Sequence, residues 1–152
     1  IKKDEAMNLY KYLTTDFEGG CYTWLDAKFV KGIGFNKLNL RTNHRKDAKG
    51  KLVFEESPLE VTLGKDCYVD LDQAKLNKQY LPKPELESQN QNYKQGDNIY
   101  FYYPRRNAVA WFGAYSGRAW LDCAWNPALH DASLGVFGCA EGTREKIKEA
   151  KT

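Results

Sequence analysis

The first stretch with a helical spacing of apolar residues covers residues 4–17. Apolar side chains recur there every three or four positions, at Ala6, Leu9, Tyr10, Leu13 and Phe17. This is the period of an amphipathic α-helix, and Gly19-Gly20 supplies a stop signal directly after it. The pattern therefore predicts an amphipathic helix near the N-terminal end of the chain.

From residue 36 onward the apolar period shortens to two, which is typical of strands. Alternating segments at 36–43 and 51–55 flank a polar, basic turn at 44–50, so a hairpin with a basic tip is expected. A second hairpin is expected from 59–63 and 67–71 around a turn at 64–66. A short helix is expected over 72–81, with Asp70 or Asp72 as its cap.

The strongest sheet signal lies between residues 99 and 125. It follows a proline-containing polar stretch at 82–98, which predicts a long, flexible surface loop. Three β-forming runs come next, at 99–103, 108–115 and 119–125, separated by short turn-forming segments. Short links favour antiparallel neighbours, so a meander is expected near 99–125. The charged stretch 141–152 is expected to form at most a frayed terminal helix.

These elements predict a single α+β domain over residues 1–152. The N-terminal helix would pack on an antiparallel β-sheet, and a chain of 152 residues is long enough to bury one core. The aromatic share of 14% also favours a sheet-rich fold, because aromatic side chains are enriched in strands.

Charge and motifs narrow the functional classes. A net charge of +3 is too small to favour nucleic acid as the partner. The chain contains no apolar run of about 18 residues, so membrane contact would need a segment before Ile1. Nucleophile, phosphate-loop and calcium-loop motifs are absent. No cofactor and no metal are therefore expected, and a non-catalytic role is favoured.

The four cysteines are Cys21, Cys67, Cys123 and Cys139. An even count without a C-x-x-C pair favours disulfides over a zinc or redox site. Of three possible connectivities, Cys21–Cys67 with Cys123–Cys139 is preferred, and closing the second loop would add about 3 kcal/mol. Such a disulfide-stapled protein would be extracellular, cell-surface or periplasmic. The alternative is four buried thiols in a cytosolic protein.

Aromatic residues in the 99–125 region provide the main candidate binding site. Tyr102 and Trp111 lie on alternating strands, with Arg105, Arg106 and Arg118 in or beside the turns. If the second face of the sheet is aromatic and exposed, it could stack on sugar rings, contact an anionic glycan or bind a receptor. The competing interpretation is a sheet buried on both sides.

The two histidines, His44 and His130, suggest a catalytic alternative. A small, basic, disulfide-bonded protein could be a secreted nuclease that uses one histidine as base and the other as acid. The competing interpretation is two solvent-exposed loop histidines.

The run from Leu13 to Cys21, in which a helix leads into Leu-Thr-Thr-Asp-Phe and then a cysteine, resembles minor type IV pilins and pseudopilins. The expected meander followed by a Cys123–Cys139 loop is similar to the head of those proteins. The resemblance implies a hydrophobic helical segment before Ile1. It also implies an exported, non-catalytic subunit of an extracellular or cell-surface assembly, with a structural or adhesion role. Its partners would be other protein subunits, or a cell-surface glycan or receptor. A glycan- or receptor-binding module and a small secreted nuclease are the alternatives.

Overall fold

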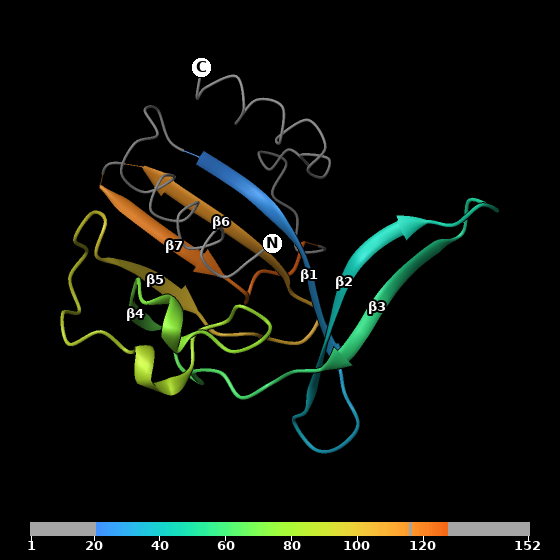
Figure 1. Ribbon diagram of the computed structural model, residues 1–152, viewed down its shortest axis with the longest axis horizontal. Helices are drawn as coiled ribbons and strands as arrows, with labels where there is room; N and C mark the ends of the chain where they lie inside the picture. The colour runs from blue at the N-terminus through green and yellow to red at the C-terminus, as the bar shows by residue number, and fades with distance from the viewer. Residues whose placement is uncertain (1–20, 116, 128–152) are drawn as a thin grey trace.

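One seven-stranded sheet organises the molecule (Figure 1). The structure, a computed structural model, describes residues 21–115 and 117–127. Its strands are β1 (Cys21–Lys31), β2 (Leu38–Lys46), β3 (Leu52–Pro58), β4 (Cys67–Asp70), β5 (Asn98–Tyr102), β6 (Val109–Tyr115) and β7 (Arg118–Asp122). Two short 3-10 turns, η1 (Gln73–Lys75) and η2 (Pro84–Leu86), lie between β4 and β5.

The sheet is mixed and its order is β3-β2-β1-β6-β7-β5-β4. Neighbouring strands are antiparallel except β5 and β7, which are parallel. β1 is third in this order and joins the β2–β3 hairpin to the later strands. Segments about ninety positions apart thereby become neighbours, since Cys21 is the register partner of Ala114.

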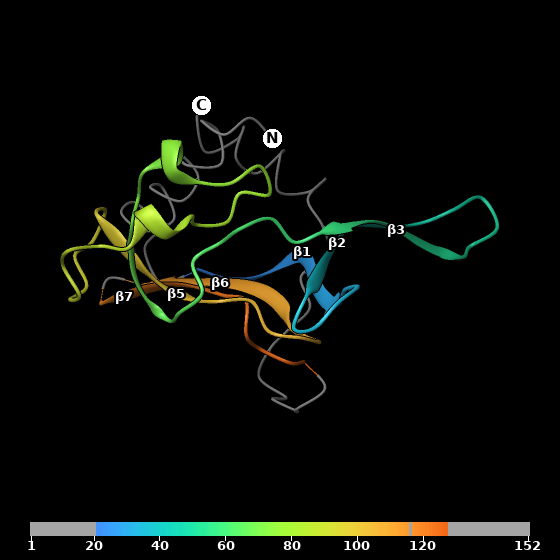
Figure 2. The ribbon, with the colours of Figure 1, turned by 90° about the horizontal axis from the view of Figure 1, so that it is seen from below.

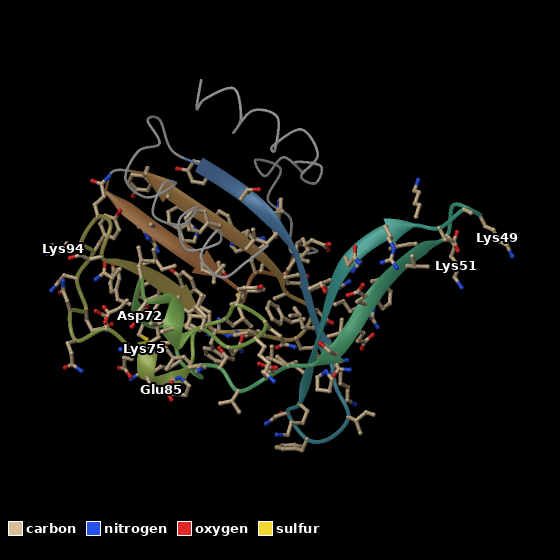
Figure 3. The ribbon with its side chains drawn as sticks, viewed as in Figure 1. Lys49, Lys51, Asp72, Lys75, Glu85 and Lys94 are labelled. Carbon is tan, nitrogen blue, oxygen red and sulfur yellow. The ribbon has the colours of Figure 1, made fainter. Side chains whose placement is uncertain are left out.

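Part of the β2–β3 hairpin projects beyond the rest of the sheet. β1 pairs with β2 between Lys28↔Arg41 and Lys31↔Leu38, whereas β2 and β3 stay paired as far as Lys46↔Leu52. Residues 42–55 therefore form a two-stranded ribbon, here called the β2–β3 ribbon, and both views show it extending away from the other strands (Figures 1 and 2). Lys49 and Lys51 lie at its far end (Figure 3).

The hydrophobic core covers one face of the sheet. Phe29, Phe101 and Phe112 are at most 1% exposed, and they come from three different strands. Most of the chain between β4 and β5 lies on this side (Figure 2), where Leu76, Leu81 and Leu86 complete the core. Burying each such side chain contributes about 2 kcal/mol. The opposite face of the sheet is therefore not part of this core.

The outer edge of β4 is closed by the segment after η2. Ser88 donates a backbone hydrogen bond to Tyr68 O, at 2.9 Å. The Gln91 side-chain amide pairs with Tyr68 as the backbone of a neighbouring strand would. Its Oε1 accepts from Tyr68 N at 3.0 Å, and its Nε2 donates to Tyr68 O at 3.2 Å. Backbone groups that an edge strand would expose are therefore occupied.

The expected α+β class is wrong for the part of the chain that the structure describes. Strands make up 48% of it, and it contains no helix of seven residues or longer. The helices expected at 4–17 and 141–152 lie outside the described residues. Among the residues described, no helix is long and apolar enough to cross a membrane.

The expected disulfides are also wrong. Cys67 and Cys123 are buried free thiols. In the case of Cys21–Cys67 the reason is distance: β1 and β4 are four places apart in the sheet order. Four strand spacings amount to about 19 Å, whereas the Cα atoms of a disulfide are no more than about 7 Å apart. Cys139 lies outside the described residues, and the free thiol of Cys123 contradicts its pairing there.

Several expected strands are confirmed and others are wrong. β2, β3, β4, β5 and the β6–β7 hairpin occur close to the expected positions, whereas 59–63 forms no strand and η1 is the only helical segment within 72–81. The meander is wrong in its order, because β7 lies between β5 and β6. The link 103–108 passes the end of one strand, which a short segment can do without making a parallel crossover.

Candidate aromatic binding site

Aromatic side chains gather on the face of the sheet opposite the core. Tyr68, Tyr100 and Trp120 are register partners on β4, β5 and β7, and the same row continues through Gly113 on β6 to Tyr22 on β1. Directly paired residues point to the same face of a sheet. This row thus crosses five strands and carries aromatic side chains on four of them.

A neighbouring row adds two tryptophans. Trp24 on β1 is the register partner of Trp111 on β6, and their ring centroids are 6.2 Å apart. The Trp111 ring is 5.4 Å from that of Trp120, in an edge-to-face arrangement, and 6.4 Å from Trp125. Such tilted geometries are favourable for aromatic pairs. All four tryptophans of the chain belong to this cluster.

Arg118 joins the tryptophans to the tyrosines of β5. Its guanidinium carbon lies 5.0 Å from the Trp120 ring centre, and its Nη2 donates to the Tyr102 hydroxyl at 2.7 Å. The Tyr102 ring is 4.8 Å from Tyr100, which contacts Tyr68 edge-on at 4.9 Å. We call this continuous set the aromatic face: Tyr22, Trp24, Tyr68, Tyr100, Tyr102, Trp111, Tyr115, Trp120, Trp125 and Arg118.

The aromatic face is packed at its centre and open at its rim. Trp120 is only 8% exposed, whereas Tyr22 and Tyr115, whose rings contact it at 5.8 and 6.1 Å, are 47% and 42% exposed. The other rings are partly buried. Burial, followed by the influence of Tyr102, raises the pKa of Tyr100, so its hydroxyl stays a neutral hydrogen-bonding group at ordinary pH. The aromatic face is therefore partly buried, with a centre shielded from solvent and an exposed rim.

Gly113 makes the packing at the centre possible. A methyl group at this position would lie 2.3 Å from Cζ2 of Trp120, which is closer than any non-bonded contact allows. Glycine within a strand often marks such a close approach. Trp120 can therefore sit over the backbone of β6.

The indole N–H of Trp111 is buried and has no hydrogen-bond partner among the described residues. An unsatisfied buried donor costs about 1–3 kcal/mol, and most such groups in folded proteins are paired. This donor belongs to a ring packed among Trp24, Trp120 and Trp125. The centre of the aromatic face thus holds hydrogen-bonding capacity that the described residues do not use.

The structure brings together three of the five expected binding residues. Tyr102, Trp111 and Arg118 all belong to the aromatic face. Arg105 and Arg106 instead lie on the link 103–108, at the end of the sheet. Arg105 pairs with Asp66 at 2.9 Å and lies 4.5 Å from the Tyr103 ring centre, and its hydrogen bond to Asp66 raises the pKa of Arg105 further above the usual range.

His44 pairs with a carboxylate rather than standing free. Its Nδ1 contacts Asp26 Oδ1, its backbone N–H donates to Asp26 Oδ2 at 3.0 Å, and its ring lies 5.5 Å from that of Phe54. His130 lies outside the described residues, so the expected histidine pair stays a prediction. No group of three or more potential metal-ligating side chains occurs within the described ranges.

Sequence reasoning missed more than half of the aromatic face. Tyr22 and Trp24 alternate at the start of β1, directly after the glycine pair that was interpreted only as a helix stop. That Tyr-x-Trp spacing is the available signal, because residues two apart share a face of a strand. The contribution of Tyr68 depends on the order of the strands, which the local pattern does not contain.

No family model, no curated protein and no solved structure matches this chain.

Proposed function

We propose that the protein is a carbohydrate-binding module that uses the aromatic face to stack against sugar rings. The observation that carries the proposal is the continuous set of nine rings across five strands, completed by Arg118. An apolar core does not need such a set on its opposite face, and exposed aromatic clusters commonly mark interaction sites.

The chemistry of the face suits a sugar better than a purely apolar partner. The C–H face of a pyranose can pack on aromatic rings, while its hydroxyls need donors and acceptors at the same depth. The tyrosine hydroxyls and the Arg118 guanidinium provide these groups. A half-buried layer is also largely preorganised, which lowers the entropic cost of binding.

The tryptophans supply the readout for a test. Because Trp24, Trp111, Trp120 and Trp125 all belong to the face, a stacked ligand should change the intrinsic tryptophan fluorescence. We expect saturable quenching by at least one member of a panel of soluble polysaccharides. The Tyr22→Ala and Tyr115→Ala variants should each bind about ten-fold more weakly, equivalent to about 1.4 kcal/mol.

Tyr80→Ala is the matched control. Tyr80 is 37% exposed, which is close to Tyr115, but it belongs to the segment that covers the core face. Its removal should leave the affinity unchanged. Absence of binding across the panel, or equal weakening by all three variants, would contradict the proposal.

The pilin-like subunit and the nuclease remain predictions beside this proposal. The resemblance to pilins begins at residues 13–20, outside the described residues, and its cysteine loop requires a partner for Cys123, which is a free thiol. The nuclease requires His130 to approach His44. No described contact favours either function over the binding module.

A further inference from the structure

A basic pocket lies at the end of the sheet where β1 ends and β6 begins. Its volume is about 270 Å³, and it is lined by Lys31, Gly34, Asn36, Lys37, Leu38, Pro104, Arg105 and Arg106. Four of these eight residues are cationic and none is acidic. Two separate segments, the β1–β2 loop and the link 103–108, meet to form it.

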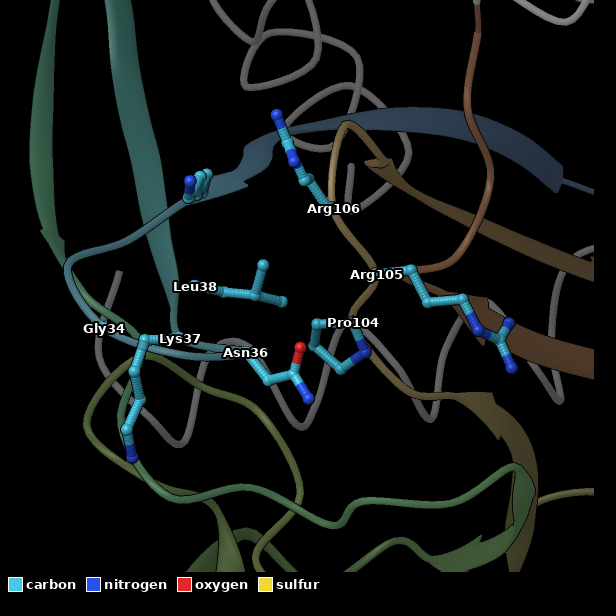
Figure 4. A pocket seen from close by; sticks show the side chains of 8 residues that line it. Gly34, Asn36, Lys37, Leu38, Pro104, Arg105 and Arg106 are labelled. Carbon is cyan, nitrogen blue, oxygen red and sulfur yellow. The ribbon is translucent and has the colours of Figure 1, made fainter.

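The arrangement of the side chains indicates the size of a suitable ligand. Pro104, Leu38 and the Asn36 amide occupy the middle of the pocket, while Lys37, Arg105 and Arg106 extend outward around them (Figure 4). A single small anion would not reach several of these cations at once. A ring-sized ligand would rest on Pro104 and Leu38 and direct a negative group towards the surrounding charges.

Most of the positive charge at the pocket has no ion-pair partner in the part of the chain that the structure describes. Arg105 is paired with Asp66, but Lys31, Lys37 and Arg106 form no ion pair among the described residues. Uncompensated positive charges around a concave site attract an anionic ligand. The pocket therefore favours a ligand that carries negative charge.

The pocket also lies along the strands that carry the aromatic face. Trp24 and Lys31 both belong to β1, and the seven residue steps from one to the other correspond to roughly 23 Å of strand. Lys31 and its register partner Leu38 lie on the same side of the sheet as Phe29 and Leu40, which is the core side. A polymer bound to the rings of β1 and β6 would therefore pass around this end of the sheet to place a sugar unit in the pocket. Arg118 already places one cation within the aromatic face itself.

From these observations we infer that the ligand is an acidic polysaccharide, and that the basic pocket holds one of its anionic sugar units. The inference rests on the proposed function and specifies its substrate class. The shared chemistry is a sugar ring that carries a carboxylate or a sulfate.

The test compares polymers that differ in charge. Affinities for polygalacturonate, dextran sulfate and neutral dextran are measured at low and high salt by tryptophan quenching. We expect at least one acidic polymer to bind ten-fold or more tightly than dextran at low salt, and the difference should shrink as salt screens the charges. The polygalacturonate and dextran sulfate arms distinguish a carboxylate from a sulfate.

Two double variants locate the effect. Lys31→Gln/Arg106→Gln removes two pocket charges and should weaken binding of the preferred acidic polymer about ten-fold, without changing the affinity for dextran. Lys75→Gln/Lys78→Gln removes the same charge from the exposed segment around η1, away from the pocket, and should have little effect.

Each other outcome would contradict the pocket, the proposed function or the class of ligand. Equal binding of acidic and neutral polymers, or equal loss in the two double variants, overturns the pocket and leaves the aromatic face. No binding of any polysaccharide overturns the proposed function together with the pocket. Tighter binding of a single-stranded oligothymidylate than of either acidic polymer overturns the polysaccharide as the ligand in favour of nucleic acid.

Discussion

The packing of Trp120 depends on the absence of a side chain at Gly113, its register partner on β6. The space above Gly113 is filled by the indole ring, and the rings of Tyr22, Trp111 and Tyr115 surround it. The position of one residue therefore sets the geometry of the whole aromatic face. The same packing is a source of stability, because Trp120 is 8% exposed.

Replacement of Gly113 by alanine should disturb this packing. The added methyl group must push the Trp120 ring or the β6 backbone aside, and overpacking of this kind costs about 1–3 kcal/mol. Urea unfolding should show the loss, and tryptophan emission of the folded variant should shift. Gly64→Ala is the control, since a methyl group there meets nothing within 4 Å, and its effect should stay within about 0.5 kcal/mol. Equal stability of the two variants would contradict the close packing.

The β2–β3 ribbon projects beyond the part of β2 that pairs with β1. Beyond Arg41 it has no register partner on β1, and Asp26 links β1 to its base through the ring and backbone of His44. Leu25 and Ala27 pack against the core, so Asp26 between them points to the same side as the aromatic face. The Asp26 carboxylate therefore holds the base of the ribbon against β1.

Removal of that carboxylate should loosen the ribbon without unfolding the sheet. In Asp26→Ala we expect amide hydrogen exchange over residues 43–56 to accelerate about ten-fold, because hydrogen bonds to a charged group contribute about 1.5–3 kcal/mol. Amides of β5, β6 and β7 should keep their protection. Glu85→Gln in η2, which removes an exposed carboxylate far from the ribbon, should change neither region. Uniform acceleration across the whole sheet in Asp26→Ala would contradict a local role.

The elements show which parts of the fold the sequence could predict. Alternation identified β2, β3 and β4, and runs of β-forming residues identified β5, β6 and β7. Alternation failed over 59–63, where Leu63 is buried in a loop and donates its backbone N–H to Pro82 O at 2.8 Å rather than to a strand. Tyr102, Trp111 and Arg118 were recognised because they lie on predicted strands or turns. The order of the strands, and with it Tyr22 and Tyr68, depends on pairings between distant segments.

At the scale of the whole molecule, the stability of the fold depends on pH through cysteine and tyrosine side chains that are neutral at ordinary pH and ionise only in alkali. Burial raises the pKa of the Cys123 thiol well above the ordinary value of 9.0 and, to a smaller extent, that of Cys67. Burial also raises the phenol pKa of Tyr100 and Tyr93 above the ordinary 10.0. All four groups prefer their protonated form in the folded protein.

The folded protein should therefore lose stability in alkali. Groups with a raised pKa contribute fully below their unfolded value and lose that contribution as pH rises towards the folded value. We expect the free energy of unfolding to fall as pH rises through 9 and 10, measured by urea unfolding with a reductant present. In Cys123→Ala the fall between pH 7 and pH 10 should be smaller, whatever the baseline stability of the variant. A constant or rising stability over this range would contradict the burial of these groups.

The closed edge of β4 has a consequence for self-association. A sheet that grows into a filament by adding copies side by side needs two strands with free backbone groups, one at each end. Here the side chain of Gln91 and the backbone of Ser88 already satisfy Tyr68 on β4. Two copies could still pair through the outer edges of their β3 strands. The resulting dimer would present a closed β4 edge at each end, so a third copy could not add there. Within the described residues, the Gln91 amide thus acts as a stop against fibrillar growth.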